Sequence, residues 1–186
     1  PEFGHDVVSM DTKLAVVDTP ALLKLDFGAG KNKRAGFEGV DVRAFDNVDH
    51  VVDLRGPWPW ADASVEEANA SHFVEHLDAN ERVHFVNELF RVLVPGGKCT
   101  VVTPHWASNR AYGDLTHKWP PVSEMWFYYL KADWRAANAP HNDMYTCDFD
   151  CTWGYSMRAD LMVRNDEYRM HALQNFKEAA HDFIAT

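Results

Sequence analysis

The sequence is short of basic residues and of long apolar runs, and each shortage excludes a class of protein. Lysine and arginine number 18 against 28 aspartates and glutamates, a formal net charge of −10. Nucleic-acid affinity rests on neutralising phosphates, so this balance disfavours a general DNA or RNA binder. No apolar run approaches the roughly 18 residues that a membrane span needs, and no signal-peptide pattern is present. We therefore predict a cytoplasmic protein with neither nucleic acid nor a membrane as its partner.

Cysteine is also scarce. Cys99, Cys147 and Cys151 are the three cysteines, and they form no C-x-x-C pair. This is typical of a reducing compartment, and it is too few thiolates for a zinc site. A length of 186 residues, 46% hydrophobic and 25% charged, fits one globular domain. Such a domain buries about 70% of its unfolded surface, so it needs no disulfide or metal to fold.

Short apolar segments bounded by glycine or acidic residues predict buried strands. They are residues 22–26, 36–41, 48–53 and 98–103, with 65–71 as a weaker candidate because of its glutamates and alanines. Strands that alternate with loops and a crossover helix indicate an α/β fold with a mostly parallel, doubly wound, Rossmann-like sheet.

One helix is clearly marked between the last two of these strands. Asp78 and Glu81 form a capping-box pattern, and apolar residues recur at helical spacing from Val83 to Leu93. The segment Pro95-Gly96-Gly97 is expected to stop this helix.

The second half of the chain is aromatic-rich over about 105–157. Within it we predict a helix over 124–137 and an extended segment over 145–155. A C-terminal helix is predicted over about 158–184, since Leu173, Phe176, Ala180, Phe183 and Ile184 would form one apolar stripe. The pattern shows no pair of antiparallel final strands, so the sheet is either truncated at that edge or has its last strand within 145–155.

Residues 25–30, LDFGAG, place two glycines directly after a predicted strand. Ligands of open α/β sheets bind beyond the carboxyl ends of the strands, and glycine lets a ligand approach the backbone. A dinucleotide fingerprint would need glycine where Lys33 stands, and a P-loop would need serine or threonine where Asn32 stands. Taken alone, the two glycines also fit a simple tight turn.

Acidic residues end the next two predicted strands. Asp41 stands where a carboxylate can accept both hydroxyls of a ribose, and Asp53 with Leu54 stands where an adenine ring could be held. Each acid alone is better explained as a strand-end or helix-cap residue. In this order, the three features point to an adenosine-containing ligand.

Together these segments resemble the class I S-adenosylmethionine-dependent methyltransferases, of the kind called type 11. The resemblance covers about residues 22–104. It rests on LDFGAG at 25–30, GVD at 39–41, VDL at 52–54, SHFVEHL at 71–77 and ELFRVLVPGG at 88–97. It implies a single methyltransferase-like domain with a cofactor-binding core and an acceptor-side insertion over about 105–157. It also implies S-adenosylmethionine as cofactor, S-adenosylhomocysteine as product, and methyl transfer as the activity.

The acceptor is expected to be a small molecule, sugar or lipid-like compound. The acidic charge favours this class, and the chain contains neither the Asn-Pro-Pro-aromatic motif of amino-directed DNA methyltransferases nor the Pro-Cys nucleophile of cytosine-C5 enzymes. Aromatic residues between Trp106 and Trp134 could stack on such an acceptor, or could form a satellite core beneath the insertion. The sequence leaves the oligomeric state open.

The resemblance also assigns residues to the cofactor. Asp26, Gly28 and Gly30 would cradle the methionine end, Asp41 would hold the ribose, and Asp53 with Leu54 would hold the adenine. Ser71 and His72 would face the methyl group, and no metal is assigned. The full set of expected cofactor contacts is Asp26, Phe27, Gly28, Ala29, Gly30, Lys31, Asp41, Val42, Asp53, Leu54, Ser71 and His72.

One departure from the family concerns the first crossover. Ten residues separate Gly30 from Asp41, where the family usually has a full helix. The anion-attracting helix N-terminus would then be weakened. Our hypothesis is that Lys31 or Lys33 supplies positive charge to the methionine carboxylate, the alternative being that both are ordinary solvated lysines.

Three of the ten histidines are candidates for a general base. A base helps when the acceptor is a hydroxyl or a protonated amine, and histidine titrates near neutral pH. His72 follows the fourth predicted strand, while His105 and His117 follow the fifth. Any one of them taken alone is more often a packing or surface residue.

Two other functions fit part of the sequence. Residues 72–76, HFVEH, match the H-x-x-E-H signature of inverted zinc peptidases, in which His72 and His76 on one helix would bind zinc and Glu75 would act as base. No flanking helix and no third carboxylate ligand are evident for that site. The other alternative is a domain that binds S-adenosylmethionine without transferring its methyl group.

Overall fold

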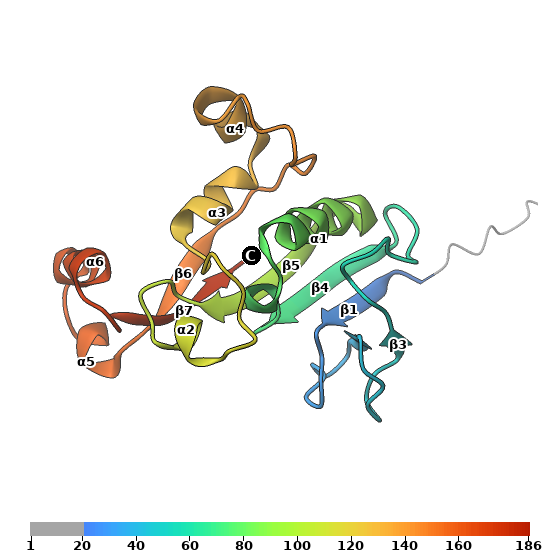
Figure 1. The fold of residues 1–186 in the computed structure, drawn as a ribbon, viewed down its shortest axis with the longest axis horizontal. Helices are drawn as coiled ribbons and strands as arrows, with labels where there is room; N and C mark the ends of the chain where they lie inside the picture. Colours follow the sequence, from blue (N-terminus) through green and yellow to red (C-terminus); the bar gives the residue numbers. More distant parts are fainter. Residues whose placement is uncertain (1–20) are drawn as a thin grey trace, which may run out of the picture.

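The computed structural model of the protein describes residues 21–186, which form a seven-stranded sheet in the order β3-β2-β1-β4-β5-β7-β6 (Figure 1). Neighbours among the first five strands run parallel, and β7 runs antiparallel to both β5 and β6. The prediction of a mostly parallel, Rossmann-like sheet is confirmed. The strands are β1 Leu23–Phe27, β2 Glu38–Asp41, β3 His50–Val51, β4 Val65–Ser71, β5 Leu93–Pro104, β6 Trp153–Met157 and β7 Ala180–Ala185.

Helix α1, Ala79–Val92, is the crossover between β4 and β5 and begins at the predicted capping box. The Asp78 carboxylate accepts from the Glu81 N–H at 2.9 Å, and the Glu81 carboxylate accepts from the Asp78 N–H at 2.8 Å. These bonds satisfy two N–H groups that a helix start leaves without partners. The expected stop at Pro95-Gly96-Gly97 is wrong, because β5 already begins at Leu93 and includes that segment. The helix ends at Val92 because the next residue, Leu93, already pairs with Val65 of β4 as the first residue of β5.

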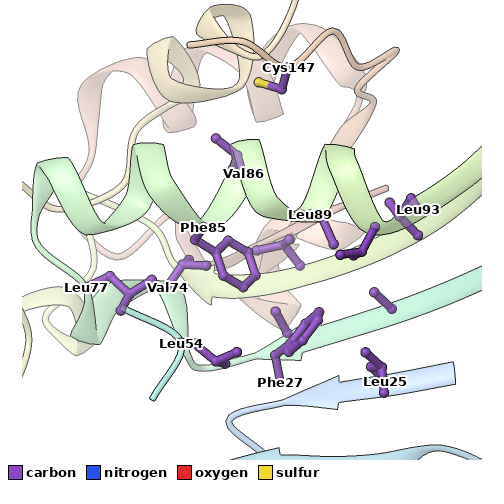
Figure 2. Close-up of a cluster of buried hydrophobic side chains, with 14 of the residues drawn as sticks. Leu25, Phe27, Leu54, Val74, Leu77, Phe85, Val86, Leu89, Leu93 and Cys147 are labelled. Atoms are coloured by element: carbon purple, nitrogen blue, oxygen red, sulfur yellow. The ribbon is translucent and has the colours of Figure 1, made fainter. Parts of the chain in front are cut away.

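The core lies between α1 and one face of the sheet. Figure 2 shows Leu25 and Phe27 of β1 pointing toward Phe85 and Leu89 of α1. The Phe27 ring centroid lies 5.6 Å from that of Phe85, with the two rings edge to face. On the other side of α1, Val86 points toward Cys147 of the insertion, so this helix is buried between the sheet and the insertion (Figure 2).

The opposite face of β1 and β4 is polar. Lys24 Nζ bonds to Glu67 at 3.2 Å, and Asp26 accepts a 2.6 Å bond from the Asn69 amide. Successive strand residues point to opposite faces, which explains why Lys24 and Asp26 alternate with the buried Leu25 and Phe27. The side chains on this face therefore form hydrogen bonds between β1 and β4, close to the glycine loop that follows β1.

Within the insertion, two helices stand where one was predicted over 124–137. These are α3, Glu124–Tyr129, and α4, Ala132–Asn138, separated by Lys131 in an extended conformation. A short helix, α2 Arg110–Gly113, precedes them. The extended prediction over 145–155 is confirmed only in part, because β6 begins at Trp153.

The predicted C-terminal helix over 158–184 is wrong. The chain forms α5, Ala159–Met162, then α6, Asp166–Asn175, and finally strand β7. In β7, Phe183 and Ala185 are buried while Ile184 is 46% exposed, which is the alternation of a strand. The sequence suggested a helix because Phe176, Ala180 and Ile184 are also spaced four residues apart. The prediction of no final antiparallel pair is wrong for the same reason, since β7 lies between β5 and β6.

Within residues 21–186, no helix combines the length and the hydrophobicity that crossing a membrane requires.

Candidate cofactor crevice

A cavity of about 590 Å³ opens where β1, β2 and β4 end. Its size lies in the usual range for small-ligand pockets, about 300–1,000 Å³. Segments far apart in the sequence form its walls. Its lining includes Gly28, Asp41, Val42, Arg43, Asp53, Leu54, Arg55, His72, Phe73, His76, Leu115, Thr116 and Lys118.

The glycine loop after β1 is held against the end of β2. The N–H groups of Gly28 and Ala29 both donate to the carbonyl oxygen of Val40, at 2.8 and 3.1 Å. Gly28 has φ of +69°, and a Cβ there would lie 2.5 Å from the Phe73 ring. Both the backbone angle and the close ring therefore require glycine at this position.

Asp26 lies behind this loop and does not line the crevice. It is 4% exposed, and its two oxygens accept bonds from the Arg34 N–H at 2.7 Å and the Asn69 amide at 2.6 Å. Its carboxylate thus holds the backbone at Arg34, where the loop after β1 passes back beside the strand end. Phe27 packs in the core, so of residues 26–30 it is Gly28 that faces the cavity.

The two strand-end acids that were predicted to hold an adenosine lie in the wall of this one cavity. Asp41 Oδ2 accepts from the Gly30 N–H at 3.0 Å and Oδ1 accepts from the Arg43 N–H at 2.9 Å. Each carboxylate oxygen keeps a further lone pair for a ligand hydroxyl. The carboxylate is thereby held in place with room to accept two more hydrogen bonds.

Asp53 is paired with Arg55 through two bonds, at 2.8 and 2.7 Å. The guanidinium lowers the pKa of the Asp53 carboxyl to about 2, so this group is ionised at neutral pH. Sequence reasoning missed Arg55, whose role becomes visible only when the loop after β3 is seen to turn back on Asp53. Leu54 beside it is buried and supplies an apolar surface.

The first crossover contains no helix between Gly28 and Phe37. Lys33 Nζ forms an ion pair with Asp49 at 2.7 Å, so its charge is neutralised just before the start of β3. Lys31 is exposed, with its ammonium 5.9 Å from the Phe45 ring centroid. Of the two lysines in our hypothesis, Lys31 is the one whose charge is not neutralised by a carboxylate within the described residues.

The candidate histidines occupy three different environments. His72 lines the cavity, and its Nδ1 lies 3.2 Å from Glu75 Oε1, a hydrogen bond that raises the His72 pKa. His105 is fully buried: its Nδ1 accepts from the Ala107 N–H at 3.1 Å and its Nε2 lies 3.2 Å from Glu124. The structure therefore gives His105 no access to an acceptor in this crevice. His117 stacks edge to face with His76, with ring centroids 4.9 Å apart.

The zinc-peptidase interpretation is wrong because its helix is missing. Residues Val74–His76 form a three-residue 3-10 helix, and His72 lies outside it with φ of +53°. His72 and His76 therefore do not share one face of a continuous helix. Ser71 is exposed at the end of β4 and does not line the cavity.

The loop after α2 completes the crevice, and sequence reasoning did not place it there. Its residues Leu115, Thr116 and Lys118 line the cavity together with residues from the strand ends. The Lys118 N–H donates to the Glu75 carbonyl at 2.8 Å, and Arg82 donates to the carbonyl of Pro120. These bonds join segments more than thirty residues apart, so no local sequence pattern predicts that this loop lies against the crevice.

Solved structures share this fold. A S-adenosylmethionine-dependent methyltransferase from Archaeoglobus fulgidus aligns with a TM-score of 0.61 and 17% identity, over 89% of this chain and 85% of that one. Geranyl diphosphate C-methyltransferase from Streptomyces coelicolor A3(2) aligns with a TM-score of 0.49 and 15% identity, over 88% and 72%. The similarity of fold is argued from the Archaeoglobus structure alone, because its TM-score is the higher of the two. No protein-family model matches the chain, and no curated protein matches its sequence at a significant level.

The strand order, the single antiparallel strand β7 and the crevice at the strand ends define a Rossmann-like fold of the class I kind. The protein has the fold of the class I S-adenosylmethionine-dependent methyltransferases, an enzyme class that uses S-adenosylmethionine and releases S-adenosylhomocysteine.

Proposed function

We propose that the protein binds S-adenosylmethionine in this crevice and transfers its methyl group to a small-molecule, sugar or lipid-like acceptor. The observation that carries the proposal is the meeting of Gly28, Asp41 and Asp53 on one cavity at the sheet's carboxyl edge. In this arrangement Asp41 would accept the ribose hydroxyls, while Asp53, Leu54 and Val42 would surround the adenine. Ligand binding at this edge is the general rule for open α/β sheets.

The transfer requires little beyond alignment. A lone pair of the acceptor attacks the methyl carbon as the carbon–sulfur bond breaks, and the sulfonium becomes the neutral thioether of S-adenosylhomocysteine. Holding the two reactants in line supplies much of the rate enhancement. The acceptor's proton, where it has one, leaves to a base.

His72 is the candidate base in this proposal, because it alone of the three predicted histidines lines the cavity. Its contact with Glu75 raises the pKa of the imidazole. A raised pKa strengthens the group as a base but moves its unprotonated form to higher pH. Activity that depends on His72 is therefore expected to rise with pH through the neutral range.

A domain that binds the cofactor without transferring methyl is the second candidate. The observation that favours it is the missing helix between β1 and β2, which removes a positive helix end from the methionine side of the crevice. A panel of acceptors with tritiated S-adenosylmethionine separates the two, since transfer to any acceptor excludes the second.

Calorimetry with S-adenosylmethionine, S-adenosylhomocysteine and NAD tests the binding step. We expect both sulfur compounds to bind at one site and NAD to fail. Asp41→Ala should weaken binding by about tenfold to a hundredfold, the loss of hydrogen bonds to a charged group worth about 1.5–3 kcal/mol. Asp160→Ala, an exposed acid of α5, is the matched control and should bind as the unaltered protein does. Equal affinity in Asp41→Ala would contradict the proposal.

A further inference from the structure

Two histidines and a glutamate converge beside the crevice. Glu75, His76 and His117 each offer one ligand atom, and these atoms all lie within 4.8 Å of one another. His76 and Glu75 come from the 3-10 helix after β4, and His117 comes from the loop after α2. Two ligand atoms on one zinc ion lie about 3.5 Å apart in a tetrahedral site, so small side-chain rotations close the gap.

The hydrogen bonds of both histidines leave the same ring nitrogen free. His117 Nδ1 lies 3.3 Å from the carbonyl oxygen of Ala111, which only accepts, so Nδ1 carries the proton. The Thr116 hydroxyl donates to Asp114 at 2.7 Å, so its oxygen is the acceptor for His76 Nδ1 at 3.0 Å. In the neutral ring with its proton on Nδ1, Nε2 keeps its lone pair and can bind a metal. Metal-binding histidines typically show such a bond from the second nitrogen to a carbonyl or polar oxygen.

Glu75 supplies the negative charge. It is only 5% exposed, and its oxygens contact the Thr103 hydroxyl at 3.1 Å and His72 Nδ1 at 3.2 Å. The neighbouring guanidinium of Arg82 directs its hydrogen bonds to the carbonyls of Val74, Lys118 and Pro120 and makes none to this carboxylate. A buried carboxylate is costly unless it is paired or binds a metal. Glu75 is already paired with His72, so the convergence of His76 and His117 on this carboxylate, and not its burial, carries the site.

We propose that Glu75, His76 and His117 form a site for one divalent transition-metal ion. Two imidazoles and one carboxylate suit zinc, iron(II) or cobalt(II) better than magnesium or calcium, which prefer oxygen ligands. Three protein ligands leave open coordination positions. This set differs from the H-x-x-E-H zinc hypothesis, which paired His76 with His72, because His117 takes the place of His72.

The position of the site suggests what the open positions hold. His76 and Thr116 line the same cavity as Asp41 and Gly28, so the ion would sit in the crevice wall. Resting on the proposed function, we infer an acceptor with an oxygen donor, such as a hydroxyl or carboxylate, that binds the ion and is thereby held near the methyl group.

Cobalt(II) provides the direct test. Tag-free protein is stripped with EDTA, desalted and titrated with Co²⁺ while its visible ligand-field absorption is recorded, and zinc binding is followed by calorimetry. We expect one ion per chain. His117→Ala and His76→Asn should each lose the absorption bands and at least tenfold in affinity, and Thr116→Val, which removes only a supporting bond, should lose about tenfold. His141→Gln, an exposed histidine elsewhere, is the matched control.

Circular dichroism establishes whether each variant is folded. If a variant of a ligand residue does not fold, Thr116→Val, which leaves all three proposed ligands in place, still tests the site. Substoichiometric binding, or equal losses in His117→Ala and His141→Gln, would overturn the metal site. Calorimetry of the metal-free protein with S-adenosylhomocysteine is scored separately. Binding of S-adenosylhomocysteine without metal binding rejects the site alone, and metal binding without S-adenosylhomocysteine binding rejects the proposed function alone.

Discussion

The carboxylate of Asp41 accepts a hydrogen bond from the backbone N–H of Gly30, at 3.0 Å. This bond joins the end of β2 to the second glycine of the loop after β1, so the two parts of the candidate adenosine site are connected directly. The Val40 carbonyl reinforces it by accepting from Gly28 and Ala29. The site is thus organised by the protein's own hydrogen bonds, and a ligand need not order it.

Gly28→Ala should destabilise the protein more than Gly36→Ala. Both glycines have positive φ, but a Cβ at Gly28 meets the Phe73 ring at 2.5 Å, whereas a Cβ at Gly36 meets nothing within 4 Å. We expect a loss of about 1–2 kcal/mol for Gly36→Ala from backbone strain alone. Gly28→Ala should lose a further 1–3 kcal/mol or so from overpacking.

Urea denaturation of both variants measures this difference. A second change, Phe73→Ala, removes the Cδ2 and Cγ atoms that a Cβ at Gly28 would meet at 2.5 and 2.9 Å. Gly28→Ala should therefore cost less in the Phe73→Ala background than in the unaltered protein, and Gly36→Ala should cost the same in both. Equal free energies of unfolding for the two glycine variants would show that the Phe73 contact is unimportant.

Asp78→Ala should lower the free energy of unfolding by about 1 kcal/mol, the usual value of a helix N-cap. Its carboxylate accepts the Glu81 N–H at the start of α1. Glu81→Ala removes the reciprocal bond and should cost less, because the cap itself remains. If thermal and urea denaturation place Asp78→Ala level with the unaltered protein, the capping box contributes nothing.

Of the two crossover lysines, Lys31 should matter for cofactor affinity and Lys33 should not. Lys33 is paired with Asp49, while Lys31 is exposed beside the glycine loop. We expect Lys31→Gln to raise the dissociation constant of S-adenosylmethionine about twofold to fivefold, the range of an exposed ion pair, with less effect at high salt. The converse ranking in calorimetry would reject the assignment to Lys31.

The thiols should be unreactive at ordinary pH. Burial raises the pKa of Cys147 and Cys151 to about 11 and that of Cys99 to about 12. Because thiolate is the reactive form, alkylation by iodoacetamide should be slow at pH 8 and should accelerate toward pH 11. The unfolded chain, with thiol pKa values near 8.5, should react fully at pH 8.

The same shifts set a pH dependence of stability. Between about pH 9 and 11 the unfolded chain loses thiol protons that the folded protein keeps, so the free energy of unfolding should fall as pH rises. Cys147→Ala should flatten this fall, whatever its effect at neutral pH. Rapid alkylation of the folded protein at pH 8 would contradict the raised pKa values of these thiols.

Local patterns and long-range contacts differ in how well the sequence predicts them. The strand-end positions of Asp41 and Asp53 follow from short apolar segments that end in an acid, and the capping box of α1 is legible in Asp78 and Glu81. Strand β7 was missed because its four-residue spacing also fits a helix, and only pairing with β5 and β6 selects the strand.

The candidate metal site shows the same limit. His76 and His117 are 41 positions apart by number, and their approach depends on the Lys118 bond to the Glu75 carbonyl and on the Arg82 bonds to residues 118 and 120. His105, by contrast, looked equivalent to His117 in the sequence. Its burial against Phe183 of β7 became visible only once that strand was placed.

A crystal structure grown with S-adenosylhomocysteine tests the central claim most directly. The account predicts a nucleoside bound across the ends of β1, β2 and β3, its ribose hydroxyls on the Asp41 carboxylate and its adenine against Leu54 beside Asp53. A nucleoside bound elsewhere, or no density in this crevice at saturating concentration, would contradict it.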